Sequence, residues 1–168
     1  KRSLDLRIRH EVDVLSKEEV QAVSAYLDTS EPGPGKEKVF LLALDKLPRY
    51  EGPAWRGIQI YSLSVLEQTK LKVGSVFKWK SRAAFSKERQ VAEEFLTSGN
   101  TGGAGQTKVL FHATLKRSAD LSTVSKDIAN GEWSFQKEVI SRKGTKFVVR
   151  KFSISPMKQQ ADIYIEEV

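Results

Sequence analysis

The sequence has 168 residues and no cysteine, and 39% of its residues are hydrophobic and 29% charged. This length and composition predict one folded domain, residues 1–168, and exclude a chain that is disordered throughout. The absence of cysteine excludes thiol catalysis, disulfide scaffolds and cysteine-bound zinc. The net charge of +7 favours anionic partners, namely nucleic acid, phosphorylated cofactors or acidic protein faces. The longest apolar run covers only residues 39–44, so no transmembrane helix is expected, because a bilayer span needs about 20 residues.

Two helices are predicted near the start of the chain. Ser16 and Glu19 form a capping-box pattern, in which the serine accepts from the amide three residues on and the glutamate reaches back. The first helix follows this pattern and ends near Asp28, because the Pro-Gly-Pro-Gly run at 32–35 cannot continue it. A second helix is predicted at about 36–47 and ends at Pro48.

The rest of the chain has mostly the alternation that is typical of strands. Strands are predicted at 54–62, 73–80, 83–86, 108–115, 136–141, 146–152 and 161–167, with a short helix at 88–96, a glycine-rich loop at 97–107 and a turn or helix at 120–128. The turn at 142–145 is expected to join its two flanking strands into a hairpin. Because helices come first and strands last, the order predicts an α+β fold with a mainly antiparallel sheet and argues against a doubly wound dinucleotide fold.

Patterns typical of other enzymes are incomplete. Residues 100–107 are similar to a phosphate-binding P-loop, but Asn100 stands at the first glycine and Gln106 at the lysine that would neutralise the phosphates. The two histidines, His10 and His112, lack metal-ligand spacing, so no metal site is predicted. His112 lies in an apolar strand, where a packed or half-buried role is expected.

Three separated stretches carry a more specific signal. Residues 41–57 end in Trp55-Arg56-Gly57, residues 84–95 run from Ala84 through Ser86 into a short helix, and residues 135–147 contain Gln136-x-Glu138 followed by a Gly-Thr turn. Together they resemble the mono-ADP-ribosyltransferases of the arginine–serine–glutamate class, known from bacterial toxins and effectors, over roughly residues 16–168. The resemblance implies N-terminal helices packed on a mainly antiparallel split β-sheet.

The resemblance implies that NAD is consumed as a substrate, without a metal. Glu138 would stabilise the positive charge that develops on the ribose when nicotinamide leaves, and Arg56 would bind the diphosphate through its planar guanidinium. Both side chains would have to converge on one cleft. Gly57 would let the ligand approach the backbone closely, and Ser86 would contribute to the NAD site. The family's serine motif aligns with 84–86 here, so its first serine, which supports the glutamate, is replaced by Ala84.

The resemblance also assigns acceptor recognition to the loop at 128–135, with Trp133 and Phe135 as exposed aromatic candidates. Gln136 precedes Glu138 by two residues, so both side chains are expected on one face of the same strand. A glutamate at this position accompanies arginine acceptors in the family. Gln136 therefore disfavours an arginine acceptor and fits the modification of an amide or a nucleic-acid base.

The acceptor itself is expected to be a macromolecule, with protein favoured over RNA or DNA. The alternative function is a non-enzymatic basic module on the same fold that binds RNA or an acidic protein. Eleven basic residues could form a surface that faces phosphates. They are Lys70, Lys72, Lys78, Lys80, Arg82, Lys87, Arg142, Lys143, Lys146, Arg150 and Lys151. The resemblance further suggests a monomeric toxin fragment of a larger secreted protein, which acts in the cytoplasm of a target cell and has a cognate immunity protein.

Overall fold

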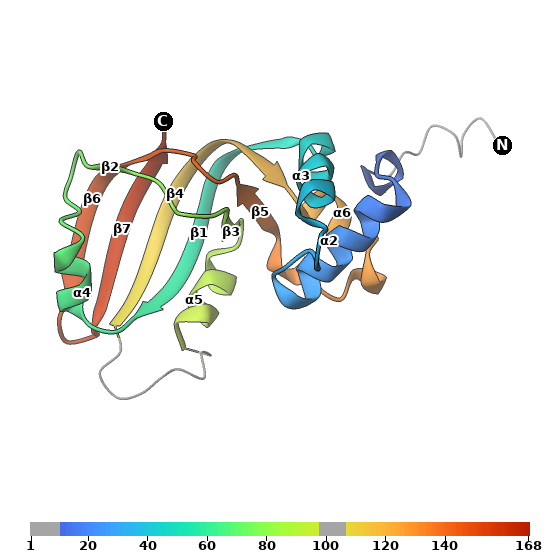
Figure 1. Cartoon of the computed structure of the whole chain (residues 1–168). Coiled ribbons are helices and arrows are strands. Elements are labelled where there is room, and N and C mark those ends of the chain that lie inside the picture. Colours follow the sequence, from blue (N-terminus) through green and yellow to red (C-terminus); the bar gives the residue numbers. More distant parts are fainter. Residues whose placement is uncertain (1–10, 98–106) are drawn as a thin grey trace. The chain divides into compact units, whose positions relative to one another are not determined.

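The computed structural model describes residues 11–97 and 107–168 (Figure 1). Within these residues the chain forms two compact units, each built from two separate stretches of sequence. The first unit contains the described residues up to Arg49 together with Ala119–Lys137, and the second contains Tyr50–Ser118 together with Glu138–Val168. The single domain expected from the chain length remains a prediction. His10 and the P-loop-like residues 100–106 lie outside the described residues.

The first unit is helical. Its elements are η1 (Glu11–Val14), α2 (Lys17–Thr29), α3 (Glu37–Lys46), α6 (Ser122–Ser125), η2 (Ala129–Gly131) and η3 (Ser134–Gln136). The predicted capping box is confirmed, because Ser16 Oγ accepts a hydrogen bond from the Glu19 amide at 3.1 Å and Glu19 Oε1 accepts one from the Ser16 amide at 2.6 Å. Lys46 donates to the same carboxylate at 2.7 Å, which ties α3 to the start of α2.

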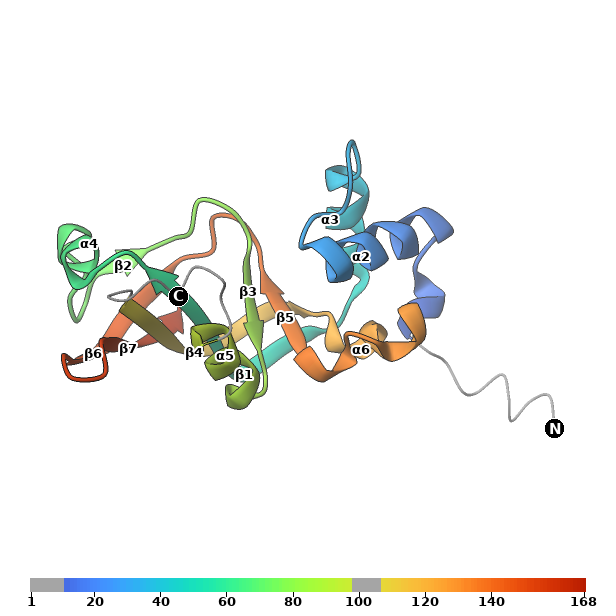
Figure 2. The ribbon, with the colours of Figure 1, turned by 90° about the horizontal axis from the view of Figure 1, so that it is seen from below.

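The second unit is built on a seven-stranded sheet (Figure 2). Its elements are β1 (Arg49–Ile60), α4 (Leu63–Gln68), β2 (Val76–Phe77), β3 (Ala83–Ser86), α5 (Arg89–Thr97), β4 (Thr107–Asp120), β5 (Glu138–Ser141), β6 (Phe147–Ser155) and β7 (Gln160–Glu167). The strand order is β1-β3-β5-β4-β7-β6-β2, with a further pairing between β1 and β4. Pairing is antiparallel between β1 and β3, β3 and β5, β6 and β7, and β2 and β6, whereas β4 and β7 are parallel. The predicted α+β fold with a mainly antiparallel sheet is confirmed.

Aromatic rings form the centre of the core in the second unit. Trp79 meets Phe77, Phe85, Phe111 and Phe147 edge to face, with ring centroids 5.0, 5.8, 5.2 and 5.3 Å away. Edge-to-face pairs add stability beyond the burial of their area. Trp79 is therefore a core residue of the second unit.

Two predictions about the strands need correction. The strand predicted at 73–80 shrinks to Val76–Phe77, since Trp79 turns into the aromatic cluster. The hairpin predicted around 142–145 is wrong, because β5 pairs with β3 and β4 whereas β6 pairs with β7 and β2. Short apolar strands carry no sequence signal that identifies their partners, so the order of strands along the chain does not predict their pairing in the sheet.

None of the helices within residues 11–97 and 107–168 has the length and apolar character that crossing a bilayer requires.

Candidate active site

The candidate site begins on β1, where Arg56 and Gly57 lie mid-strand. Gly57 faces α5: a Cβ there would lie closer than 3.0 Å to the carbonyl oxygen of Ala92 and 3.1 Å from Leu96 Cδ2. Two residues further along β1, the side-chain amide of Gln59 donates a hydrogen bond from Nε2 to the Leu96 carbonyl at 2.8 Å. The structure therefore gives Gly57 a packing role, in which it lets α5 lie against β1. Its part in ligand binding stays a prediction.

Ser86 and Glu138 are direct partners across β3 and β5. Residues opposite each other in an antiparallel pair have Cβ atoms about 4.5–5.5 Å apart and lie on the same face of the sheet. Ser86 is 6% exposed, and Glu138, the first residue of β5, is half-buried. Ser86 Oγ accepts a hydrogen bond from the Glu88 amide at 3.0 Å, which fixes the turn into α5. The pairing places a hydroxyl beside a half-buried carboxylate.

The register places Ser86, and not Ala84, opposite the glutamate. Ala84 pairs with Ile140, two residues away from the glutamate, whereas Ser86 pairs with Glu138. Ser86 is therefore the serine beside the carboxylate, and the replacement of the family's first serine by Ala84 stays a prediction.

Arg56 is anchored against β3. It follows Trp55, which pairs with Ser86, so Arg56, Ser86 and Glu138 belong to three successive strands. Because side chains alternate and paired residues share a face, Arg56 leaves β1 on the face of the sheet opposite to Trp55, Ser86 and Glu138. Its guanidinium carbon lies 5.5 Å from the centroid of the Trp79 ring, and Nη1 donates to the Ala84 carbonyl at 3.0 Å. The strand register thus brings Ser86 and Glu138 together directly but does not bring Arg56 to their face, and the convergence of Arg56 and Glu138 on one cleft stays a prediction.

Gln136 does not lie on the strand of Glu138, contrary to expectation. It ends the 3-10 helix η3, and Lys137 has left-handed backbone angles of φ 46° and ψ 50° before β5 begins. Side-chain alternation therefore cannot be extended back from Glu138 to Gln136. Trp133 and Phe135 precede it with ring centroids 6.3 Å apart, and Phe135 is 53% exposed. The expected loop is a compact pair of 3-10 turns, in which Ser134 Oγ donates to the Gly131 carbonyl at 2.8 Å.

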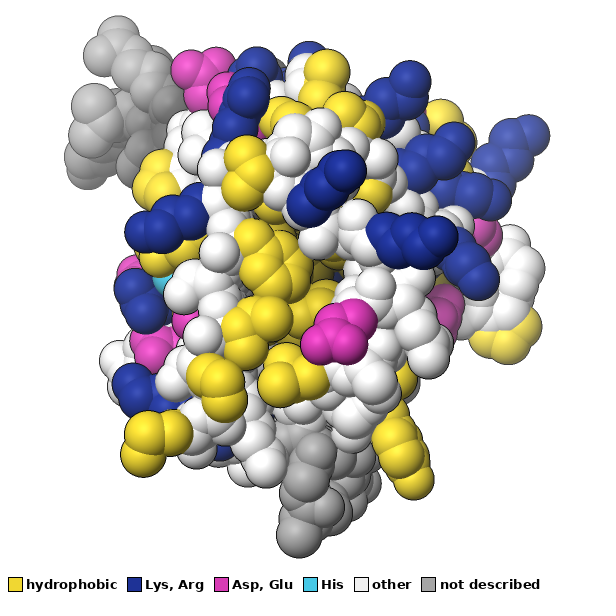
Figure 3. Space-filling view, turned by 90° about the vertical axis from the view of Figure 1, so that its left-hand side faces the viewer, with side chains coloured by type: hydrophobic (Ala, Val, Ile, Leu, Met, Phe, Trp, Pro, Cys, Tyr) yellow, Lys and Arg dark blue, Asp and Glu magenta, His cyan; other side chains and the backbone are white. Residues whose placement is uncertain are grey.

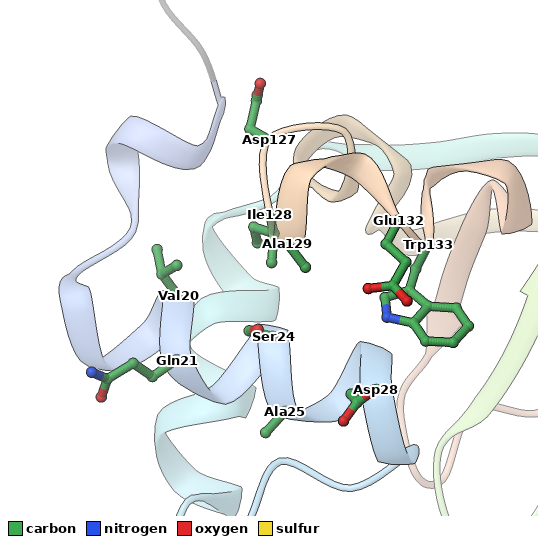
Figure 4. Close-up of a pocket in the computed structure, with 10 residues that line it drawn as sticks. All are labelled: Val20, Gln21, Ser24, Ala25, Asp28, Asp127, Ile128, Ala129, Glu132 and Trp133. Carbon is green, nitrogen blue, oxygen red and sulfur yellow. The ribbon is translucent and has the colours of Figure 1, made fainter.

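A groove of about 650 Å³ lies in the first unit between α2 and the segment that carries Trp133 (Figure 4). Apolar side chains such as Ala25 and Ile128 line its middle, and the carboxylates of Asp28, Asp127 and Glu132 line it without any lysine or arginine. Figure 4 shows Glu132 and Trp133 pointing toward Asp28 at one end, while Asp127 points away. No sequence motif marks these carboxylates, because Asp28 lies about a hundred residues before Asp127 and Glu132 in the chain.

The remaining candidates have structural roles. His112 Nε2 lies 2.9 Å from Asp162 Oδ1, and the histidine ring stacks on Tyr164 with centroids 4.1 Å apart. The packed role expected for His112 is confirmed. Among the residues that the structure describes, no cluster of three or more histidine or acidic side chains could hold a metal ion.

No family model and no curated protein matches the sequence of the chain. Solved structures of known proteins do match its fold. The Vis toxin of Vibrio splendidus, an ADP-ribosyltransferase, is similar to it with a TM-score of 0.70 at 19% identity, over 94% of this chain and 76% of that chain. The chain has the ADP-ribosyltransferase fold.

Two further structures extend the ADP-ribosyltransferase likeness. The type III effector XopAI of Xanthomonas axonopodis pv. citri matches with a TM-score of 0.63 at 16% identity, over 94% of this chain and 70% of that chain. Exoenzyme S of Pseudomonas aeruginosa, solved with human 14-3-3 protein beta and bound to carba-NAD, matches with a TM-score of 0.60 at 16% identity, over 92% of this chain and 76% of that chain. The structures that share the fold of this chain thus include a toxin, a type III effector and a protein bound to an NAD analogue.

Proposed function

We propose that this chain is an NAD-dependent mono-ADP-ribosyltransferase, which cleaves the nicotinamide–ribose bond and transfers ADP-ribose to a macromolecule. The observation that carries the proposal is the pairing of Ser86 with Glu138 at the start of β5. The ADP-ribosyltransferase fold supports it, since this pair lies on strands of that fold.

In the proposed reaction the bond between nicotinamide nitrogen and ribose C1 breaks, and nicotinamide leaves with the bonding electrons. The ribose then carries positive charge in an oxocarbenium-like transition state. The Glu138 carboxylate stabilises this charge and accepts a hydrogen bond from a ribose hydroxyl, and the Ser86 hydroxyl holds the carboxylate in place. The acceptor nucleophile attacks C1 and loses its proton to a base or to water.

Arg56 contributes a fixed positive charge for the NAD diphosphate. Its planar guanidinium can donate two parallel hydrogen bonds to two of the phosphate oxygens. Because the same guanidinium donates to the Ala84 carbonyl and lies over Trp79, its replacement also weakens the contact between β1 and β3. Variants of Glu138 are for this reason a cleaner test of the chemistry than variants of Arg56.

The acceptor is a protein, and Gln136 argues against arginine as the modified residue. Two features of the first unit support a protein. Phe135 is exposed beside Trp133, as an aromatic anchor for a protein face would be. The groove lined by Trp133 carries Asp28, Asp127 and Glu132, which repel the phosphates of a nucleic acid. Gln136 is a neutral side chain that can both donate and accept hydrogen bonds at the acceptor group.

The setting proposed for this activity is the cytoplasm of a target cell, into which the chain is delivered as a toxin or effector. Vis is a toxin and XopAI is a type III effector, and this chain shares their fold. A cognate immunity protein in the producing cell and a monomeric state in solution belong to the same proposal.

The proposal is tested by the release of nicotinamide from NAD and by the transfer of labelled ADP-ribose. Glu138→Gln keeps the shape of the side chain and removes its charge, and Glu94→Gln makes the same change at an exposed position of α5. We expect a loss of at least about 10²-fold for Glu138→Gln, the usual size for a group that stabilises transition-state charge, and no loss for Glu94→Gln. Equal rates for the wild type and Glu138→Gln refute the proposal.

The same assay decides the alternative function, a basic binding module without catalysis, which the net charge of +7 favours. In that case the wild type turns over no NAD, while its affinity for RNA or an acidic protein falls steeply with salt. Transfer assays with purified RNA, DNA and lysate protein identify the acceptor class.

A further inference from the structure

Two short connectors in the second unit are held side by side by strand pairing at both ends. Residues 78–82 join β2 to β3, and residues 142–146 join β5 to β6. Phe77 pairs with Phe147 at one end, and Ala83 pairs with Ser141 at the other. Figures 1 and 2 both show the two segments running next to each other between the paired strands. The connectors therefore form one continuous surface, although more than 50 residues separate them in the sequence.

This surface is strongly basic, and we call it the basic ledge. It consists of Lys78, Lys80, Arg82, Arg142, Lys143 and Lys146, and neither connector contains an acidic residue. The four lysines are exposed and the two arginines are half-buried. Trp79 turns inward to the aromatic cluster, so its neighbours Lys78 and Lys80 are presented to solvent. Six of the chain's 28 basic residues thus lie on two connectors of five residues each.

Exposed apolar side chains lie at the β2 end of the ledge. Val76 of β2 is 59% exposed and Val73, just before it, is 62% exposed. Val76 pairs with Val148 next to the Phe77–Phe147 pair, so it is continuous with the ledge. Figure 3 shows Lys and Arg side chains gathered in the upper right of the face that it presents, beside a central strip of hydrophobic side chains.

We propose that the basic ledge and Val76 bind an acidic protein segment that carries an apolar residue. Lysines and arginines supply charge complementarity for carboxylates, and an apolar contact beside the charges is typical of protein interfaces. A single-stranded nucleic acid would need aromatic rings on which its bases stack, and the one aromatic side chain of the connectors, Trp79, is turned into the core. This inference does not depend on NAD chemistry, because the lysines of the ledge have no part in the proposed reaction.

The test uses fluorescence anisotropy with three probes: a short glutamate-rich peptide with a central leucine, the same peptide with serine in place of leucine, and a single-stranded RNA of similar length. The ledge variant replaces the exposed lysines Lys78, Lys80, Lys143 and Lys146 by glutamine. Its matched control replaces four exposed lysines elsewhere by glutamine, so that both variants lose the same charge. The four control lysines are Lys17, Lys38, Lys126 and Lys158. We expect the ledge variant to bind the leucine peptide at least about tenfold more weakly than the control does at physiological salt.

A second variant, Val76→Ser, separates the apolar contact from charge. It should weaken binding of the leucine peptide a few-fold and leave binding of the serine peptide unchanged. The proposal is overturned if the ledge variant and its control lose affinity equally, because net charge alone then explains binding. It is also overturned if the ledge variant loses RNA affinity but no peptide affinity, which would assign the ledge to nucleic acid. Nicotinamide release measured on the ledge variant should equal that of the wild type, so failure here is distinct from failure of the transferase proposal.

Discussion

Replacement of Gly57 by alanine should destabilise the second unit more than any other exchange of glycine for alanine in its described residues. The added Cβ would lie 3.1 Å from both the Ala92 carbonyl carbon and Leu96 Cδ2, where about 3.5–4.0 Å is ordinary, and still closer to the Ala92 oxygen. A backbone carbonyl in a helix cannot rotate away, so α5 has to move. Overpacking costs about 1–3 kcal/mol, and the lost bond from Gln59 to the Leu96 carbonyl costs about 1 kcal/mol more. We expect a loss of about 3 kcal/mol in the free energy of unfolding.

The assay is urea unfolding followed by circular dichroism. Gly144→Ala is the control, because a Cβ there meets nothing within 4 Å and only the backbone angle of φ 88° opposes it. That strain costs roughly 1–2 kcal/mol. If Gly57→Ala loses no more stability than Gly144→Ala, close packing of α5 on β1 is not the reason for the glycine.

Two further substitutions, Glu19→Gln in the first unit and Trp79→Ala in the second, test the packing of the two units. Burial raises the pKa of Glu19, but hydrogen bonds from Lys46 and Ser16 outweigh this and hold the pKa below its ordinary value. The carboxylate therefore stabilises the fold above its unfolded-state pKa, and this stabilisation is lost as pH falls through the lower folded-state value. Urea unfolding at a series of acidic pH values should show that the free energy of unfolding falls more steeply with pH for the wild type than for Glu19→Gln. Parallel pH dependences of the two proteins would contradict this prediction. Trp79→Ala should cost about 3–5 kcal/mol and remove the near-ultraviolet circular dichroism of the aromatic cluster, whereas an unchanged spectrum would place the ring outside it.

Local signals in the sequence predicted local structure well. The capping box at Ser16 and Glu19 fixed the start of α2, because both partners lie within one turn. The strand at 83–86 was predicted with its observed ends, Ala83 and Ser86. Pairings between distant segments were not predictable in this way. β3 and β5 have four residues each, and the register that places Ser86 opposite Glu138 depends on contacts across more than 50 residues of chain.

The same limit explains the correction at Gln136. Alternation of side chains holds only inside a strand, and the position at which β5 begins is set by the left-handed turn at Lys137. No glycine or asparagine at 137 marked that turn. The sequence placed the six residues of the basic ledge within a larger basic set, but it did not show that they are neighbours, since the two connectors are brought together only through the pairs Phe77–Phe147 and Ala83–Ser141.

The central claim is that Ser86 and Glu138 act as one unit in the cleavage of NAD. The most direct test is kcat/KM for nicotinamide release by the wild type, Ser86→Ala, Glu138→Gln and the double variant. If the serine acts only by holding the carboxylate, Ser86→Ala should lose activity, Glu138→Gln should lose at least about 10²-fold, and the double variant should be no worse than Glu138→Gln alone. A wild type that releases no nicotinamide, or losses that add up independently in the double variant, would contradict the account.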